Sequence, residues 1–202
     1  MTETRAPRVG LFGGTFDPPH KGHAAVAADV ADYLDLDRVL WIPAGVPPHK
    51  ALGAVSPGAV RVEMVHAAIV SDARFEVSTL ETDRPGRSYA VDTVRAVRTQ
   101  LPDAELFLIV GADQFREFDR WRAPDEILRH VRLAVMDRAG ESAEKLAGNV
   151  AAGHEALFVP VRRLDISSTA VREAARQGRD LREWVAAGVD AIIEREGLYS
   201  GV

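Results

Sequence analysis

The sequence predicts an α/β protein in which a parallel β-sheet is flanked by helices and followed by a small C-terminal helical part. Short apolar segments bounded by Gly, Pro or Asp alternate with segments of helical periodicity, an order typical of a parallel sheet wrapped by helices. The chain has 202 residues, which suits one domain over 1–202. Residues 181–199 follow the final apolar segment, and we expect them to form a C-terminal helical extension.

Six segments have the pattern of buried strands, because each is short, apolar and bounded by turn-forming residues. In chain order they are Val9–Phe12, Arg38–Pro43, Phe75–Ser78, Leu106–Val110, Leu133–Met136 and Leu157–Val159. Helical spacing is found in Ala24–Leu34, Pro57–Val70, Tyr89–Gln100, Pro124–His130, Ser168–Gln177 and Leu181–Gly197. Pro57 and Pro124 fall in first turns, where a missing N–H leaves no hydrogen bond unmade. Ser88 is expected to cap the helix that follows it.

Composition excludes several classes of function. The 25 Lys and Arg residues are outnumbered by 30 Asp and Glu, the formal net charge is −5 and the basic residues are scattered, so a nucleic-acid partner is not expected. The absence of Cys excludes disulfides and thiolate metal sites. The first residues have no apolar core and no apolar run is long enough to span a membrane, so we expect no signal peptide, no membrane partner and a cytoplasmic location. A homo-oligomer stays open, because the oligomeric state cannot be derived from these residues.

Four segments with residues typical of binding sites each follow a predicted strand. These segments are 13–23, 47–50, 111–113 and 166–169. In an open parallel sheet, ligands bind beyond the carboxyl ends of the strands. We therefore expect the four segments to converge on one cleft.

The first of these segments reads Gly-Gly-Thr-Phe-Asp-Pro-Pro-His-Lys-Gly-His from Gly13 to His23. A strand, a glycine turn and a helix start place free backbone N–H groups and the positive end of a helix dipole against a phosphate. His20 and His23 add two imidazole donors at the same helix start. The glycine spacing differs from the P-loop and from the dinucleotide-binding pattern. Alone, the histidine pair would also fit a tight turn with two surface histidines, but the full string is far more restrictive.

The string is similar to the His-x-Gly-His signature of a nucleotidyltransferase superfamily whose members share a Rossmann-like fold. Within it, the chain closely resembles the bacterial nicotinate-nucleotide adenylyltransferases, from Val9 to about Tyr199. The resemblance implies transfer of the adenylyl group of ATP to nicotinate mononucleotide (NaMN) in NAD biosynthesis, giving deamido-NAD (NaAD) and pyrophosphate. It implies direct in-line attack without a covalent enzyme intermediate, and Mg²⁺ that bridges substrate phosphates without protein ligands.

The resemblance assigns catalytic roles to His20, His23, Lys50 and Arg172. The two histidines would contact the ATP phosphates and stabilise the charge that develops as the α-phosphate is attacked. Lys50 ends the string Pro-Pro-His-Lys and would reach toward nucleotide phosphates, although this string also fits a stiff surface loop. Arg172 ends Ile-Ser-Ser-Thr-Ala-Val-Arg, which matches the superfamily's second signature with Val171 in place of Ile and would bind the β- and γ-phosphates of ATP.

The resemblance also implies which residues contact the two nucleotides. ATP would be bound by Gly13, Gly14, Thr15, Phe16, Gly22, Gly111, Asp113, Ile166, Ser167, Ser168 and Thr169. NaMN would be bound by Ser88, Tyr89, Ala90 and Trp121, with the Trp121 indole stacked on the pyridine ring. The family usually has Ser-Tyr-Thr where this chain has Ser88-Tyr89-Ala90, so a hydroxyl is lost there and a backbone N–H contact is kept.

Two alternative functions stay open at this point. A phosphopantetheine adenylyltransferase or a cytidylyltransferase would share the histidine pair and the serine-rich signature, but typically lacks the combined Pro-Pro-His-Lys, Gly-Ala-Asp and downstream Trp. A module that senses a nucleotide without turning it over is disfavoured by the intact His20, His23, Lys50 and Arg172. The preference for nicotinate over nicotinamide mononucleotide is inferred from the family alone.

Overall fold

The computed structural model describes residues 5–45, 55–137 and 156–200. In this part of the chain one sheet contains six strands, and every strand pair is parallel. The strands are β1 (Arg8–Gly14), β2 (Arg38–Pro43), β3 (Phe75–Val77), β4 (Glu105–Gly111), β5 (Arg132–Asp137) and β6 (Ala156–Pro160). The predicted α/β class is confirmed, and each predicted strand is present within two residues of its expected bounds.

The strand order β3-β2-β1-β4-β5-β6 creates a switch point between β1 and β4. The chain runs outward from β1 through β2 to β3, and then crosses back so that β4 pairs with the other side of β1. Ligands of open parallel sheets bind beyond the carboxyl ends of strands at such a point. Gly14 and Gly111, which end β1 and β4, therefore lie where a ligand site is expected.

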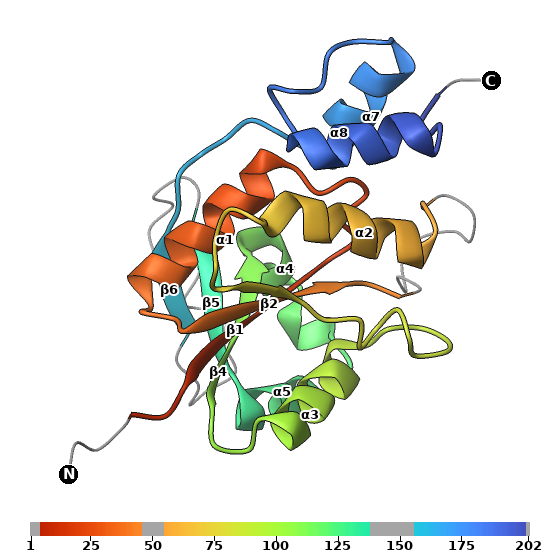
Figure 1. The fold of residues 1–202 in the computed structure, drawn as a ribbon. Helices are drawn as coiled ribbons and strands as arrows, with labels where there is room; N and C mark the ends of the chain where they lie inside the picture. The colour runs from red at the N-terminus through yellow and green to blue at the C-terminus, as the bar shows by residue number, and fades with distance from the viewer. Residues whose placement is uncertain (1–4, 46–54, 138–155, 201–202) are drawn as a thin grey trace.

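Helices cover both faces of the sheet (Figure 1). The helices described are α1 (Lys21–Tyr33), α2 (Gly58–Ile69), α3 (Ala90–Gln100), α4 (Ala112–Arg116), α5 (Pro124–His130), α7 (Ser168–Arg176) and α8 (Ala187–Arg195). Alternate strand side chains fill two apolar layers, with Phe12 and Trp41 beneath α1 and α2, and Leu11 and Ile42 beneath α3 and α5. α7 and α8 lie outside α2 and share a third apolar cluster with it.

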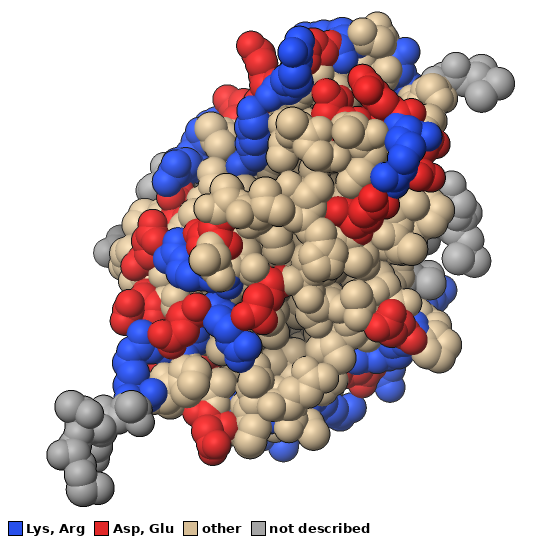
Figure 2. Space-filling view, viewed as in Figure 1, with Lys and Arg blue, Asp and Glu red and all other residues tan. Residues whose placement is uncertain are grey.

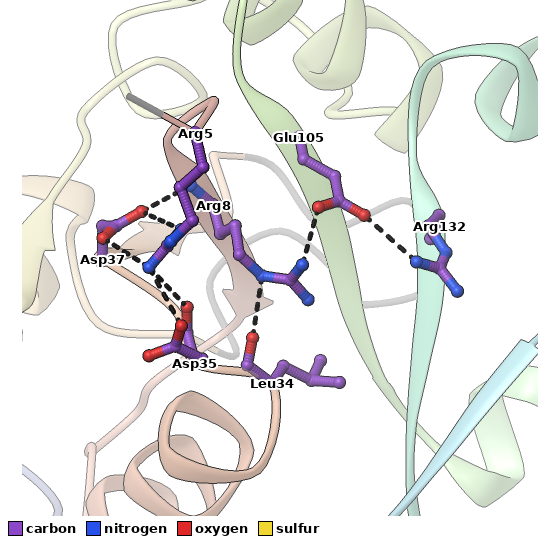
Figure 3. Close-up of polar contacts among 7 residues, drawn as sticks. All are labelled: Arg5, Arg8, Leu34, Asp35, Asp37, Glu105 and Arg132. Carbon is purple, nitrogen blue, oxygen red and sulfur yellow. Dashed lines mark hydrogen bonds and ion pairs between the residues drawn. The ribbon is translucent and has the colours of Figure 1, made fainter. Parts of the chain in front are cut away.

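The edge of the sheet where the strands begin is tied by partly exposed ion pairs (Figure 3). Glu105 at the start of β4 bridges Arg8 of β1 at 2.9 Å and Arg132 of β5 at 3.1 Å. Asp37 accepts the backbone N–H of Arg8 at 2.7 Å and pairs with Arg5. The hydrogen bond from the Arg8 backbone is the main reason that the pKa of Asp37 is lowered. These contacts align the strand starts on the edge opposite the candidate site.

The helices differ from the sequence prediction at three places. α1 begins at Lys21, three residues before the predicted start at Ala24, because His20 and His23 cap it. α4 and a 3₁₀-helix over Phe118–Arg120 fall in a segment for which no helix was predicted. The C-terminal helix begins at Ala187 rather than Leu181, since the carbonyl of Trp184 accepts the N–H of Lys21 and residues 181–185 form a turn.

The surface carries side chains of both charges, in keeping with the similar numbers of basic and acidic residues in the sequence. On the face drawn in Figure 2, basic and acidic side chains are interspersed around a broad area of other residues. None of the helices among the described residues is long and apolar enough to cross a membrane.

Candidate active site

His20 and His23 form a reciprocal cap at the start of α1. The backbone N–H of His23 donates to Nδ1 of His20 at 3.3 Å, and the backbone N–H of His20 donates to Nδ1 of His23 at 3.2 Å. The two rings are stacked with their centroids 3.6 Å apart and their planes 25° from parallel. His20 thus takes the place of the Ser, and His23 the place of the Glu, of an ordinary capping box.

This cap fixes the tautomer of both imidazoles. A ring nitrogen that accepts a hydrogen bond carries no proton, so a neutral imidazole in this position has its proton on Nε2. Both histidines therefore present an Nε2–H donor at the amino end of α1, where the helix dipole also favours negative charge. His20 is 6% exposed, and the ring of Phe16 lies edge-on to His23 with centroids 5.2 Å apart, so packing restricts the orientation of both donors.

The glycines and Phe16 of the first motif have unequal structural roles. A Cβ at Gly14 would lie 2.8 Å from the Phe16 ring, and a Cβ at Gly22 would lie 3.0 Å from Nδ1 of His20, so both glycines permit close packing inside the protein. A Cβ at Gly13 would have no described atom within 4 Å. The Phe16 ring is 2% exposed, so its predicted contact with ATP would come from its backbone. Gly13 is the glycine beside open space at which a ligand can approach.

The second signature docks onto the first. The hydroxyl of Ser168 donates to the carbonyl of Pro18 at 2.9 Å, and Nη1 of Arg172 donates to the carbonyl of Asp17 at 2.8 Å. Nη2 of Arg172 also donates to Oγ1 of Thr169 at 3.1 Å, and Ser167 caps α7. The predicted convergence of these two segments is confirmed, and the start of α7 lies beside the loop that leads to His20.

Gly111 and Asp113 lie at the start of α4, directly after β4. The N–H of Gly111 donates to Oε1 of Gln114 at 3.2 Å. The Asp113 side chain is 98% exposed and pairs with Arg116 at 2.5 Å. The predicted contact of Asp113 with ATP stays a prediction, and its exposed side chain would be accessible to a ligand. The predicted Lys50, with residues 47–49, lies outside the described residues.

The residues predicted to bind NaMN occupy two neighbouring segments. Cζ of Arg122 lies 4.8 Å from the centroid of the Tyr89 ring, which joins residues 121–122 to the start of α3. Trp121 is half-buried against Phe118, with ring centroids 5.3 Å apart. The predicted cap by Ser88 is wrong, because Tyr89 is the N-cap and the Ser88 hydroxyl accepts the N–H of Gly45 at 3.1 Å instead.

Comparison with known proteins decides the family. The model of the cytidylyltransferase-like family matches residues 11–174. The chain belongs to this family. A "Probable nicotinate-nucleotide adenylyltransferase" of Thermus thermophilus is 43% identical over 95% of this chain and 99% of the relative, and one of Shouchella clausii is 38% identical over 95% and 96%. The resemblance to the bacterial nicotinate-nucleotide adenylyltransferases is therefore confirmed.

Solved structures with low sequence identity share the fold. A nicotinic acid mononucleotide adenylyltransferase of Plasmodium falciparum complexed with NaAD has a TM-score of 0.78 at 14% identity, and covers 96% of this chain and 97% of its own. A putative nicotinate-nucleotide adenylyltransferase of Vibrio parahaemolyticus has a TM-score of 0.70 at 20% identity, with 97% of each chain covered. The cytidylyltransferase-like fold is thus present along nearly the whole chain.

Arg61 is a buried residue of this cytidylyltransferase-like site that sequence reasoning missed. Its side chain is 2% exposed and lies on α2. It donates to the carbonyls of Thr15 at 2.9 Å, Gly45 at 3.1 Å and Ser56 at 3.0 Å. Burial lowers the pKa of its guanidinium, and nearby acidic groups partly offset this. Arg61 therefore ties the loop after β1 to the loop after β2, and no local sequence pattern marks it.

Proposed function

We propose that this member of the cytidylyltransferase-like family is a nicotinate-nucleotide adenylyltransferase of NAD biosynthesis. It transfers the adenylyl group of ATP to NaMN and releases NaAD and pyrophosphate. The observation that carries the proposal is the reciprocal His20–His23 cap at the start of α1, with the Ser168–Arg172 segment docked beside it. The 43% identity to a relative of that name supports the choice of NaMN as acceptor.

The chemistry needs positioned charge rather than a protein nucleophile. A phosphate oxygen of NaMN attacks the α-phosphorus of ATP, the new P–O bond forms in line, and the bond to the β-phosphate oxygen breaks to release pyrophosphate. The Nε2–H groups of His20 and His23 donate to the oxygens on which charge develops. Because their Nδ1 atoms are held by backbone N–H groups, the donors are oriented before substrate arrives.

Arg172 and Lys50 supply positive charge for the phosphates in this proposal. A guanidinium carries five N–H donors, so the contacts of Arg172 with Asp17 and Thr169 orient it and leave donors for the β- and γ-phosphates. Gly13, Thr15 and the start of α7 would approach ATP through backbone N–H groups and hydroxyls. Lys50 would reach toward the nucleotide phosphates, as the resemblance implies.

A divalent metal accompanies ATP in enzymes of this kind, and we infer that it is Mg²⁺ bound through the phosphates. Among the described residues, no group of three or more His, Asp or Glu side chains could hold a metal ion. In this proposal the metal arrives with ATP as part of the substrate. The cytoplasmic location expected from the sequence, like the single domain over 1–202, stays a prediction.

The acceptor would lie between the start of α3 and residues 121–122. The first N–H groups of α3 have no side-chain cap, which suits a nicotinate carboxylate, and Trp121 offers an aromatic face for the pyridine ring. Ala90 contributes its backbone N–H and no hydroxyl.

Pyrophosphate release tests this proposal directly. The enzyme is assayed with ATP and Mg²⁺ in parallel with NaMN, nicotinamide mononucleotide and phosphopantetheine, and with CTP in place of ATP. We expect strong release with ATP and NaMN, and much weaker release in every other pairing. Release with phosphopantetheine or CTP alone would overturn the acceptor or donor assignment. Tight ATP binding without any release would support a nucleotide-sensing module instead.

A further inference from the structure

The short segment from Asp17 to Lys21, which carries His20, is held by the C-terminal part of the chain through backbone and side-chain contacts. Its partners come from four places between Ser168 and Tyr199. The contacts are Arg172 Nη1 to Asp17 O (2.8 Å), Ser168 Oγ to Pro18 O (2.9 Å), Lys21 N to Trp184 O (2.8 Å) and Tyr199 Oη to Asp17 Oδ1 (2.6 Å). The last two partners lie beyond residue 174, where the family match ends.

The carboxylate of Asp17 is the buried centre of this arrangement. It is 3% exposed, and its two oxygens have different partners: Oδ1 accepts the Tyr199 hydroxyl, and Oδ2 accepts the N–H of Ser56 at 3.2 Å. The buried Arg61 donates to the carbonyl of Ser56 at 3.0 Å and so places a positive charge nearby. A buried carboxylate needs such partners, because an unpaired one is strongly disfavoured.

Tyr199 stays protonated and can act as a permanent donor to this carboxylate. Burial raises the pKa of Tyr199, and its hydrogen bond to Asp17 raises it further. The hydroxyl of Tyr199 also lies 3.4 Å from Oγ of Ser56, so it contacts two of the groups that surround Asp17. Residue 199 is thereby linked to a motif that lies at the opposite end of the sequence.

We propose that Tyr199 is a positioning residue for His20, acting through the carboxylate of Asp17. The Tyr199 hydroxyl fixes Asp17 on one side of His20, while the Trp184 carbonyl fixes Lys21 on the other. His20 is the N-cap of α1, so a shift of either flank would rotate its Nε2–H away from the reacting phosphate. Displacement of a catalytic group by about 1 Å can lower a rate by about a hundredfold. Only the kinetic test of this proposal depends on the proposed function.

The decisive comparison is Tyr199→Phe with Tyr33→Phe, an equal change on a tyrosine that is 59% exposed on α1. Removal of the Tyr199 hydroxyl is expected to lower kcat about tenfold, with both KM values changed less than about twofold, because the loss lies in orientation rather than binding. Tyr33→Phe is expected to match the wild type. Circular dichroism melting sets the assay temperature well below the midpoint of each variant. A kcat of Tyr199→Phe equal to that of Tyr33→Phe would overturn the proposal.

A double-mutant cycle with Asp17→Ala, which removes both acceptor oxygens, tests the route through the carboxylate. If Tyr199 acts through Asp17, then Tyr199→Phe will change kcat less than about twofold in the Asp17→Ala background. Independent, multiplicative effects of the two changes would contradict this route.

The ¹⁵N resonances of the His20 imidazole provide a readout that needs no turnover. They are expected to move in Tyr199→Phe and to stay in place in Tyr33→Phe, because only the first change releases the backbone next to His20. Unchanged resonances in both variants would overturn the proposal. If the wild type releases no pyrophosphate with NaMN, the proposed function fails, and this measurement still decides the role of Tyr199.

Discussion

The two halves of the candidate site are held in very different ways. On the ATP side, His20 and His23 cap each other, Asp17 is buried, and Arg61 binds three backbone carbonyls. On the acceptor side, Trp121 is only half-buried and α3 begins without a side-chain cap. Segments that are distant in the sequence hold the first half in place, whereas the second half has fewer such contacts among the described residues.

This difference matches the demands of the two halves of the proposed reaction. Charge develops on the ATP phosphates, and donors that stabilise it are most effective when they are oriented beforehand. The acceptor has to enter, align and leave as part of the dinucleotide product. Its binding surface can adjust around it and does not need to be oriented before the substrate binds. We therefore expect substitutions on the ATP side to change kcat and stability, and substitutions on the acceptor side to change KM.

The largest effect is expected from His20→Ala or His23→Ala. Each removes an Nε2–H donor, and loss of one such donor typically lowers kcat by about 10²- to 10³-fold. The matched control is His66→Ala, which removes an exposed histidine from α2 and should leave kcat unchanged. Steady-state pyrophosphate release at saturating ATP and NaMN measures the difference. Wild-type activity in either variant would contradict the role of oriented histidine donors on the ATP side.

Arg61→Met should produce the largest loss of stability. The change leaves the carbonyls of Thr15, Gly45 and Ser56 without their buried donor, and we expect the free energy of unfolding to fall by about 3 kcal/mol. Arg38→Met, which breaks a partly exposed ion pair with Glu76, should cost about 0.5 kcal/mol or less. Urea unfolding curves compare the two variants, and equal losses would show that the loops are not tied through Arg61.

Trp121→Leu tests whether the acceptor side is energetically separate. Leu retains an apolar contact with Phe118 but offers no aromatic face, so KM for NaMN should rise about tenfold while KM for ATP stays within about twofold. Arg120→Ala is the control, because Arg120 is 81% exposed and pairs with Glu117 in the same segment. A parallel rise in KM for ATP would mean that the two halves are coupled through this segment.

Much of the fold and the ATP side could be predicted because their signals are local. Short apolar segments marked the strands, and two glycine- and serine-rich strings marked helix starts that do meet at Pro18 and Ser168. α4 escaped because it has five residues, too few for a helical period to show. A serine directly before a helix predicts a cap at Ser88, but its hydroxyl accepts the N–H of Gly45, which lies in the loop after β2 and is distant in the sequence.

Arg61 and Tyr199 could not be predicted because their partners are distant in the sequence. Arg61 binds backbone carbonyls, which leave no trace in residue identity, and it stands beside apolar α2 residues such as Met64 and Val65. Tyr199 reaches a carboxylate 182 positions away. Nothing around Asp17 in the sequence indicates that its carboxylate is buried. Polar pairs of this kind form only when the fold brings distant residues together, so no local sequence pattern indicates them.

The smallest effect is expected in the second half of α1, away from the histidines, where Asp29 binds Arg162. Arg162 donates to the Asp29 carboxylate through its backbone N–H at 2.8 Å and through Nε at 2.9 Å. Burial raises the pKa of Asp29, but the hydrogen bonds and charge of Arg162 outweigh burial and leave the pKa lowered. A lowered pKa in the folded state means that this contact stabilises the protein above the unfolded pKa of about 3.9, and that the stabilisation is lost as the pH falls through the folded value.

Asp29→Asn should therefore lower the free energy of unfolding by about 1 kcal/mol at pH 7, and by progressively less below about pH 4. Urea unfolding of the variant and the wild type at pH 7 and pH 3 measures this change, and kcat at pH 7 should be unaffected. A stability difference that stayed constant with pH would show that the carboxylate charge is not what Arg162 recognises. A fall in kcat would show that the whole of α1, rather than its capped start alone, sets the geometry of the ATP side.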